Sequence, residues 1–210
     1  MPGPASVWSI VVAGGSGERF GERKQYLDLG GIRVLDWALA AARASSQGVV
    51  LVVPADRAAA SEPGADRVVA GGATRSASVR AGLAAVPADA TVIVVHDAAR
   101  PVPAPEVWGR VLAAVAAGAD AAVPCVPVTD TLREVGGSTV DRTGIVAVQT
   151  PQAFRAGSLR AAHQHEAEGT DDASLVEAAG GRVVVVEGDP RNIKITTATD
   201  LALAELLCRG

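Results

Sequence analysis

The first residues that can do chemistry follow an apolar run near the N-terminus. Residues 13–21 read AGGSGERFG, directly after a run rich in Val and Ile that ends at Ala13. Glycines let the backbone turn sharply and bring its N–H groups close to phosphate oxygens. A plain glycine turn is the alternative. We interpret this segment as a phosphate cradle.

Two familiar phosphate motifs are missing from this segment. There is no G-x-x-x-x-G-K-[ST], and the pair Gly15 and Gly17 lacks the third glycine of the dinucleotide pattern. Basic residues follow instead, namely Arg19, Arg23 and Lys24. Fixed cations beside a phosphate cradle stabilise the negative charge that grows during phosphoryl chemistry.

Lysine is rare in this chain. Lys24 and Lys194 are the only lysines among 19 basic residues, and all the others are arginine. A compact ammonium retained against this bias suits a point charge on one phosphate oxygen. The alternative is that both are ordinary surface residues.

Two later segments also follow apolar runs. Residues 71–78 read GGATRSAS, where small side chains can admit a flat base and Ser76 is expected to cap a helix. Residues 96–101 read HDAARP, where Asp97 can hold Mg²⁺ and Arg100 can support an anion. A surface ion pair between Asp97 and Arg100 is the alternative. His96 ends an apolar strand, and we give it no chemical role.

The elements that carry these segments alternate between strands and helices. The Val- and Ile-rich runs predict mostly parallel strands at 8–13, 49–53, 68–70, 92–96, 121–128 and 183–187. Helices are predicted at 34–44, 76–85, 105–116 and 158–167, with a last helix at 201–207 behind a capping pair, Thr197 and Asp200. The pattern predicts one α/β domain over residues 1–210. Ligands of such sheets bind beyond the carboxyl ends of the strands, so the loops after Ala13, Ala70 and His96 should meet.

Composition excludes several classes of protein. A net charge of -4 and a pI near 5.4 disfavour nucleic-acid binding. Cys125 and Cys208 lack paired spacing, which fits a reducing cytosol and neither a disulfide framework nor a zinc site. The N-terminal apolar run is too short for a signal peptide or a membrane span. We therefore expect a cytoplasmic protein without a membrane or nucleic-acid partner.

Residues 131–148 break the alternation. Apolar residues there surround GGS and DRTG turns, which predicts a β-hairpin arm. A lone two-stranded ribbon is barely stable in water, so we expect this arm to pack against a second copy of the chain in a homodimer.

Seven segments in order resemble one enzyme family. AGGSGERFGERKQY, GGATRSASVRAGL, VVHDAARP, PVTDTLREV, AVQTPQAFR, TDDASLVEAAGG and GDPRNIKITTATDLALAE resemble the 2-C-methyl-D-erythritol 4-phosphate cytidylyltransferases of non-mevalonate isoprenoid synthesis. The resemblance implies a Rossmann-like three-layer α/β sandwich, mostly parallel, with a protruding β-arm that completes the partner's site. It also implies that the acceptor phosphate attacks the α-phosphorus of CTP, with Mg²⁺ as the metal, and that pyrophosphate leaves.

The resemblance assigns roles to matching positions. Catalytic residues would be Arg19, Lys24, Lys194 and Asp97, with Asp97 also at the metal. The nucleotide would be bound by Ala13, Gly14, Gly15, Gly17, Gly72, Arg75 and Ser78. The acceptor would be bound by Asp97, Arg100, Thr139, Arg142, Arg155, Thr170 and Lys194, with Thr139 coming from the partner's arm.

The chain departs from the family pattern next to Lys24. Arg23 stands where the family usually has proline, and the loop from Arg19 to Lys24 is shorter than usual. Arg23 or Lys24 is therefore expected to supply the catalytic charge. A ribitol 5-phosphate cytidylyltransferase and a non-catalytic nucleotide-binding protein are the alternative functions.

Overall fold

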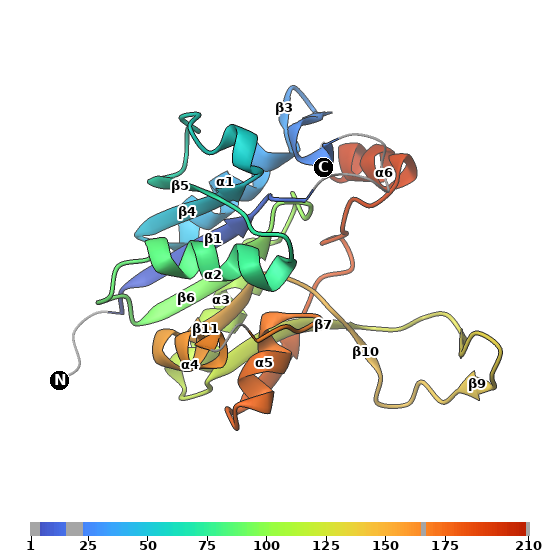
Figure 1. The fold of residues 1–210 in the computed structure, drawn as a ribbon. Helices are drawn as coiled ribbons and strands as arrows, with labels where there is room; N and C mark the ends of the chain where they lie inside the picture. The colour runs from blue at the N-terminus through green and yellow to red at the C-terminus, as the bar shows by residue number, and fades with distance from the viewer. Residues whose placement is uncertain (1–4, 16–22, 165–166, 209–210) are drawn as a thin grey trace.

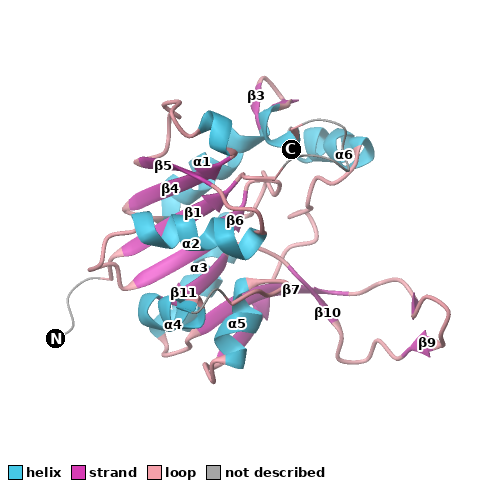
Figure 2. Ribbon diagram, viewed as in Figure 1, coloured by secondary structure: helices cyan, strands magenta, loops and turns pink. Residues whose placement is uncertain are grey.

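A mostly parallel sheet runs through the centre of the molecule, with helices on both of its faces (Figures 1 and 2). The structure is a computed structural model that describes residues 5–15, 23–164 and 167–208. None of the helices within these ranges is long and apolar enough to cross a membrane.

The strands of the main sheet are β1 (Val7–Val12), β4 (Gly48–Val53), β5 (Arg67–Ala70), β6 (Val92–Asp97), β7 (Ala121–Pro127), β10 (Val146–Val148), β11 (Gln152–Arg155) and β12 (Val183–Glu187). The helices are α1 (Val34–Ser45), α2 (Arg75–Ala85), α3 (Pro105–Ala116), α4 (Ala156–Ala162), α5 (Asp172–Ala178) and α6 (Ala198–Cys208). Shorter elements are η1 (Lys24–Tyr26), β2 (Asp28–Leu29), β3 (Ile32–Arg33), η2 (Ala55–Arg57), β8 (Leu132–Arg133) and β9 (Thr139–Val140).

The sheet has the order β10-β7-β11-β6-β1-β4-β5, with β12 on the outer side of β7. β1 lies parallel to both β4 and β6, whereas β11 runs antiparallel between β6 and β7. All six predicted strands are confirmed to within one residue at each end. The sequence missed β11 because this short segment, QAFR, lacks the Val and Ile run of its neighbours.

Alternating side chains of the strands build two core layers. Ile10, Val50 and Val52 pack with α2, α4 and α5 on one face, whereas Val11 and Leu51 pack with α1 and α3 on the other. Figure 1 shows α2, α4 and α5 in front of the sheet, with α1 and α3 behind it. Burial on both faces explains why these strands are continuously apolar. The α/β fold and its three layers are confirmed.

Two helix predictions need correction. Thr74, and not Ser76, caps α2, because its side chain accepts the Ala77 N–H at 3.0 Å. Ser76 is buried inside the helix. The predicted helix 158–167 is α4, which begins and ends earlier, at Ala156–Ala162. The capping pair at the start of the last helix is confirmed, since Asp200 and Thr197 each accept the other's backbone N–H, and α6 begins at Ala198, three residues earlier than predicted.

The arm differs in part from its prediction. β8 pairs antiparallel with β9 to form a hairpin tip, as expected. Residues 146–148, which the sequence assigned to the arm, form β10 and pair with β7 in the main sheet. The remainder projects from the body of the molecule in Figure 1.

Gly82 lies where α2 crosses the sheet, and its missing side chain sets how closely they pack. A Cβ on Gly82 would lie 2.6 Å from Ile10 Cγ2 and 3.1 Å from Val52 Cγ2. We predict that Gly82→Ala destabilises the protein by about 1–3 kcal/mol, as overpacking typically does. The measurement is the free energy of unfolding by chemical denaturation.

Gly109 in α3 is the matched control, because a Cβ there meets nothing within 4 Å. Gly109→Ala is expected to stabilise the protein by up to about 1 kcal/mol through helix propensity. Equal stability of the two variants would contradict the packing at Gly82.

Candidate active site

Three loops meet at one edge of the sheet. In the strand register Val12 lies beside Asp97 and Val52, and Val53 lies beside Ala70. The turn after β1, the loop after β5 and the loop after β6 therefore leave neighbouring strands at the same end. This is the edge at which the sequence predicts ligand binding.

A cavity of about 540 Å³ opens between these loops. Many of the predicted site residues line it, namely Ala13, Gly14, Gly15, Lys24, Gly72, Arg75, Ser78, Asp97 and Lys194. Gly17 and Arg19, which were also predicted, lie outside the described residues.

A second cavity of about 390 Å³ adjoins the first. It contains the predicted residues Arg100 and Thr170, and it shares Arg75, Asp97 and Lys194 with the first cavity. Its wall also contains residues that the sequence did not single out, namely Val148, Gln149, Thr150, Gln152 and Asp171. The three shared residues thus stand between two compartments.

Asp97 is the centre of this shared group. Lys194 Nζ lies 2.7 Å from Asp97 Oδ2, and Arg75 Nε lies 3.5 Å from Oδ1. Burial alone would raise the pKa of Asp97, but the charges of Arg75 and Lys194 outweigh it and hold this pKa well below its usual value. The carboxylate is therefore ionised at neutral pH, and two cations surround it.

Arg100 does not form the surface ion pair with Asp97 that was the alternative interpretation. Its guanidinium donates to the carbonyl of Asn192 at 2.7 Å and to that of Val148 at 3.3 Å. Burial lowers the pKa of Arg100 even though Asp97 opposes this effect. These backbone contacts hold a third cation at the wall of the second cavity.

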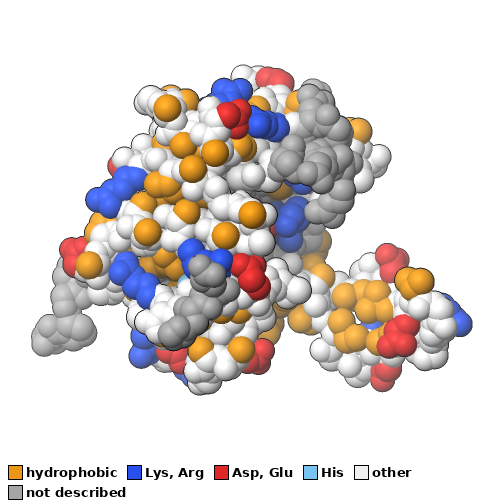
Figure 3. Space-filling view, viewed as in Figure 1, with side chains coloured by type: hydrophobic (Ala, Val, Ile, Leu, Met, Phe, Trp, Pro, Cys, Tyr) orange, Lys and Arg blue, Asp and Glu red, His pale blue; other side chains and the backbone are white. Residues whose placement is uncertain are grey.

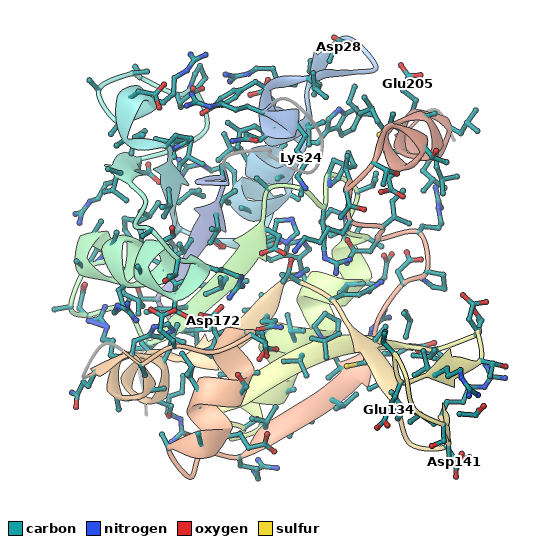
Figure 4. The ribbon with its side chains drawn as sticks, turned by 45° about the vertical axis from the view of Figure 1, so that its right-hand side comes forward. Lys24, Asp28, Glu134, Asp141, Asp172 and Glu205 are labelled. Atoms are coloured by element: carbon teal, nitrogen blue, oxygen red, sulfur yellow. The ribbon has the colours of Figure 1, made fainter. Side chains whose placement is uncertain are left out.

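The buried carboxylate of Asp172 orients the Arg75 side chain. Asp172 is fully buried, and its Oδ2 accepts a hydrogen bond from Arg75 Nη1 at 2.7 Å. The other oxygen of Asp172 lies 3.0 Å from His163 Nε2. Asp172 opens α5, so this helix positions the cation that both cavities share. Figure 4 shows Asp172 and Lys24 within the body of the molecule, on different segments.

His96 ties the loop after β6 to Thr150. Its Nε2 lies 3.0 Å from the Arg100 carbonyl, and its Nδ1 lies 3.1 Å from Thr150 Oγ1. Thr150 Oγ1 in turn accepts the Asp97 N–H at 3.0 Å. The carbonyl requires a proton on Nε2, which leaves Nδ1 to accept from the hydroxyl. His96 is therefore a buried structural histidine, as the sequence suggested.

Close packing explains the small residues of the loop after β5. A Cβ on Gly72 would lie 2.5 Å from the Ala77 Cβ. Ser78 is buried, accepts the Gly72 N–H at 3.2 Å and donates to the Thr74 carbonyl at 2.9 Å. Ser78 therefore shapes the cavity wall as well as lining it.

Lys24 begins the short helix η1. Arg23, directly before it, forms a two-pronged ion pair with Asp56, at 2.7 and 3.0 Å. The Tyr26 ring stacks on the Arg57 guanidinium, whose central carbon lies 4.8 Å from the ring centroid. Lys24 lines the first cavity, whereas Arg23 points toward η2. The geometry favours Lys24 over Arg23 as the source of charge in the cavity.

Three of the predicted residues lie away from this site. Arg155 ends β11 beside Val92, at the opposite edge of the sheet, and its side chain donates to the Gly118 carbonyl. The structure therefore does not bring Arg155 to either cavity of this chain. Thr139 and Arg142 lie on the arm, where Arg142 donates to the carbonyl of Val128 at 2.6 Å. Figure 4 shows Glu134 and Asp141 on the same arm, away from Lys24.

The acidic residues limit how a metal can bind. Within the described residues no group of three or more His, Cys, Asp or Glu side chains is arranged to hold a metal ion. Mg²⁺ usually takes one or two carboxylates and the phosphate oxygens of a substrate. Asp97, a single carboxylate with spare lone pairs, fits an ion that is bound mainly by a triphosphate.

The chain was compared with known proteins. Residues 7–209 match the protein family described as 2-C-methyl-D-erythritol 4-phosphate cytidylyltransferase. The enzyme of that name from Nocardia farcinica is 44% identical, over 96% of this chain and 94% of its own. The Rhodococcus jostii enzyme of the same name is 42% identical, over 98% of this chain and 96% of its own. The crystal structure of the Thermus thermophilus enzyme is 40% identical and superposes with a TM-score of 0.82, covering 96% of this chain and 98% of that one.

His96 gives the stability of the protein a pH dependence. Its burial lowers the pKa from 6.5 to about 4. Between these values the unfolded chain binds more protons than the folded one, so stability is full above pH 6.5 and falls as the pH drops toward 4. The loss expected from this group is about 3 kcal/mol at 1.4 kcal/mol per pH unit.

Denaturant unfolding at pH 7 and pH 4.5 measures this dependence, with His96→Gln as the control that cannot titrate. The variant should be less stable at pH 7 but show a smaller drop on acidification. An equal drop in both proteins would contradict a neutral buried His96.

Proposed function

Because the chain belongs to the 2-C-methyl-D-erythritol 4-phosphate cytidylyltransferase family, we propose that it joins CTP to 2-C-methyl-D-erythritol 4-phosphate. A phosphate oxygen of the acceptor attacks the α-phosphorus of CTP. The bond between the α-phosphorus and the bridging oxygen breaks, and pyrophosphate leaves with that oxygen. The products are pyrophosphate and the cytidine diphosphate ester of methylerythritol.

The single observation that supports this reaction is the pair of cavities that meet at shared charges. Arg75, Asp97 and Lys194 line both compartments, so two ligands bound side by side would face each other across these residues. Both substrates are phosphate esters, and their approach concentrates negative charge. Lys194 and Arg75 lie where that charge would accumulate, and preorganised cations are worth most there.

On the nucleotide side, the larger cavity suits CTP. Ala13 would line the nucleotide site, and Gly14 and Gly15 would bring their backbone N–H groups to the phosphates, with Lys24 beside them. Gly17 and Arg19 are proposed to continue this cradle, as the family resemblance implies. Gly72 and Ser78 form the small-residue wall against which a flat base can lie.

On the acceptor side, Arg100 and Lys194 would bind the phosphate of methylerythritol phosphate. Thr170 lies in the same wall as Asp171, and their side chains suit hydroxyl groups of a polyol. Asp97 would keep Lys194 in place, at 2.7 Å. No general base is needed, because a phosphate nucleophile is already anionic near neutral pH.

Magnesium would enter with the triphosphate. We propose Asp97 as the carboxylate that holds it, and the ion would supply further charge neutralisation at the phosphates. Since CTP is a cytosolic nucleotide, we expect the reaction to run in the cytoplasm.

The arm gives a reason to propose a homodimer. Val135 and Ile145 on the arm are exposed although they are apolar, and so are Val146 and Val148 in β10, where the arm returns to the sheet. Figure 3 shows hydrophobic side chains gathered on this arm. We propose that residues 1–210 form one domain whose arm covers the partner and brings Thr139 and Arg142 to the partner's acceptor site.

Pyrophosphate release tests the proposed function. Purified protein with CTP and Mg²⁺ is offered methylerythritol phosphate or ribitol 5-phosphate, and the rates are compared. We expect turnover with methylerythritol phosphate. A faster rate with ribitol phosphate would favour the ribitol enzyme, and CTP binding without pyrophosphate release would favour a binding-only protein.

Lys24→Ala should lower kcat at least about a hundredfold, because lost transition-state charge stabilisation has that size. Arg23→Ala is the matched control, since that cation is bound to Asp56 and should cost far less. A larger loss of kcat in Arg23→Ala than in Lys24→Ala would assign the catalytic charge to Arg23.

Mixing two inactive variants tests the arm. Lys24→Ala removes the catalytic cation, and Thr139→Asp adds a negative charge to the arm that would repel the acceptor phosphate. If the arm completes the partner's site, a refolded mixture contains hybrid dimers with one intact site and regains about a quarter of the wild-type activity for random pairing. No recovery in a mixture that contains dimers would contradict the shared site.

A further inference from the structure

Gln25 connects η1 to the glycine turn after β1. Both segments line the first cavity. The Gln25 side chain is only 4% exposed and lies between η1 and the glycine turn. Its Nε2 donates to the Ala13 carbonyl at 2.8 Å and to the Gly15 carbonyl at 3.2 Å. One amide group therefore connects the turn after β1 directly to the residue next to Lys24.

The bond to Ala13 also fixes the direction of an N–H group. In a planar trans peptide the C=O and the following N–H point in opposite directions. Since the Ala13 carbonyl points to Gln25, the Gly14 N–H points away from it. The Ala13 N–H, which belongs to the preceding peptide, donates to the Val52 carbonyl at 2.8 Å, so the chain is also held to the sheet directly before this peptide.

Lys24 is held by the same short helix. The Tyr26 N–H donates to the Arg23 carbonyl at 3.0 Å, and the Leu27 N–H donates to that of Lys24 at 3.2 Å. The flanking contacts, Arg23 with Asp56 and Tyr26 with Arg57, are on or near the surface. Gln25 is the buried residue of η1, and its amide bonds to the described part of the glycine turn.

We propose that Gln25 is a positioning residue for nucleotidyl transfer, one that holds the Lys24 ammonium and the Gly14 N–H in a fixed relation to the same phosphates. The inference rests on the proposed function. It predicts that loss of the Gln25 amide lowers kcat through Lys24. Gln25 does not line the second cavity, so the KM for the acceptor should not change.

Gln25→Met tests this role, because methionine keeps the length and volume of the side chain but has no amide. We expect kcat to fall about a hundredfold, the size of effect that a misplacement of about 1 Å produces. Gln47→Met is the matched control. Gln47 also bonds two backbone groups, Val7 N–H and Ala5 C=O, at the other end of β1 and away from both cavities. It should retain near-normal kcat.

A double-mutant cycle separates positioning from folding. If Gln25 acts through Lys24, Gln25→Met should cost less than about tenfold in a Lys24→Ala protein, because coupled residues are not additive. A further hundredfold loss there, or wild-type kcat in Gln25→Met alone, would overturn the inference. Failure of the wild-type enzyme to release pyrophosphate would instead reject the proposed function, so the two failures are distinguishable.

Discussion

The site depends on a buried negative charge that needs partners. Asp97 is 8% exposed at the end of β6, and an unpaired carboxylate there would be costly. Its two cations come from distant parts of the chain, Arg75 from α2 and Lys194 from the segment before α6. Pairing therefore draws three segments to one point. That point is where the two cavities meet.

A second buried acid extends this pattern. Arg75 lies between Asp97 and Asp172, so its guanidinium is oriented by carboxylates on two sides. Removal of one partner from a buried pair is far more damaging than the pair is stabilising. We regard these contacts as a way to fix the direction of a cation before substrate binds. Preorganisation of this kind avoids reorganisation during the reaction.

Neutral groups hold the rest of the wall. Thr150, His96 and the Arg100 carbonyl form a chain that starts at the Asp97 N–H and contains no ion. Gln25 similarly ties the glycine turn to η1 through an amide. Charges are thus concentrated where two phosphate esters are proposed to meet, whereas uncharged hydrogen bonds shape the surroundings. The charge of Arg23 lies outside the group that the two cavities share, because it is paired with Asp56 on η2.

The sequence by itself determined the α/β class, six strands of the main sheet and the edge of the sheet at which Asp97, Arg75 and the glycine turn meet. These follow from local periodicity and from the rule that parallel strands present their carboxyl ends together. The sequence did not identify Gln152 in β11 as a residue of the site, because a polar residue interrupts the apolar pattern there.

Only the tertiary structure decided which charges pair. Asp97 has Arg100 as a near neighbour in sequence, yet it pairs with Lys194, which is 97 residues away. The tertiary structure also places Arg155 away from the site, because β11 runs antiparallel and Arg155 lies at the opposite edge of the sheet. Gln25, Asp172 and Thr150 gained their roles in the same way. Such roles depend on distances between segments, and no local pattern of residues encodes those distances.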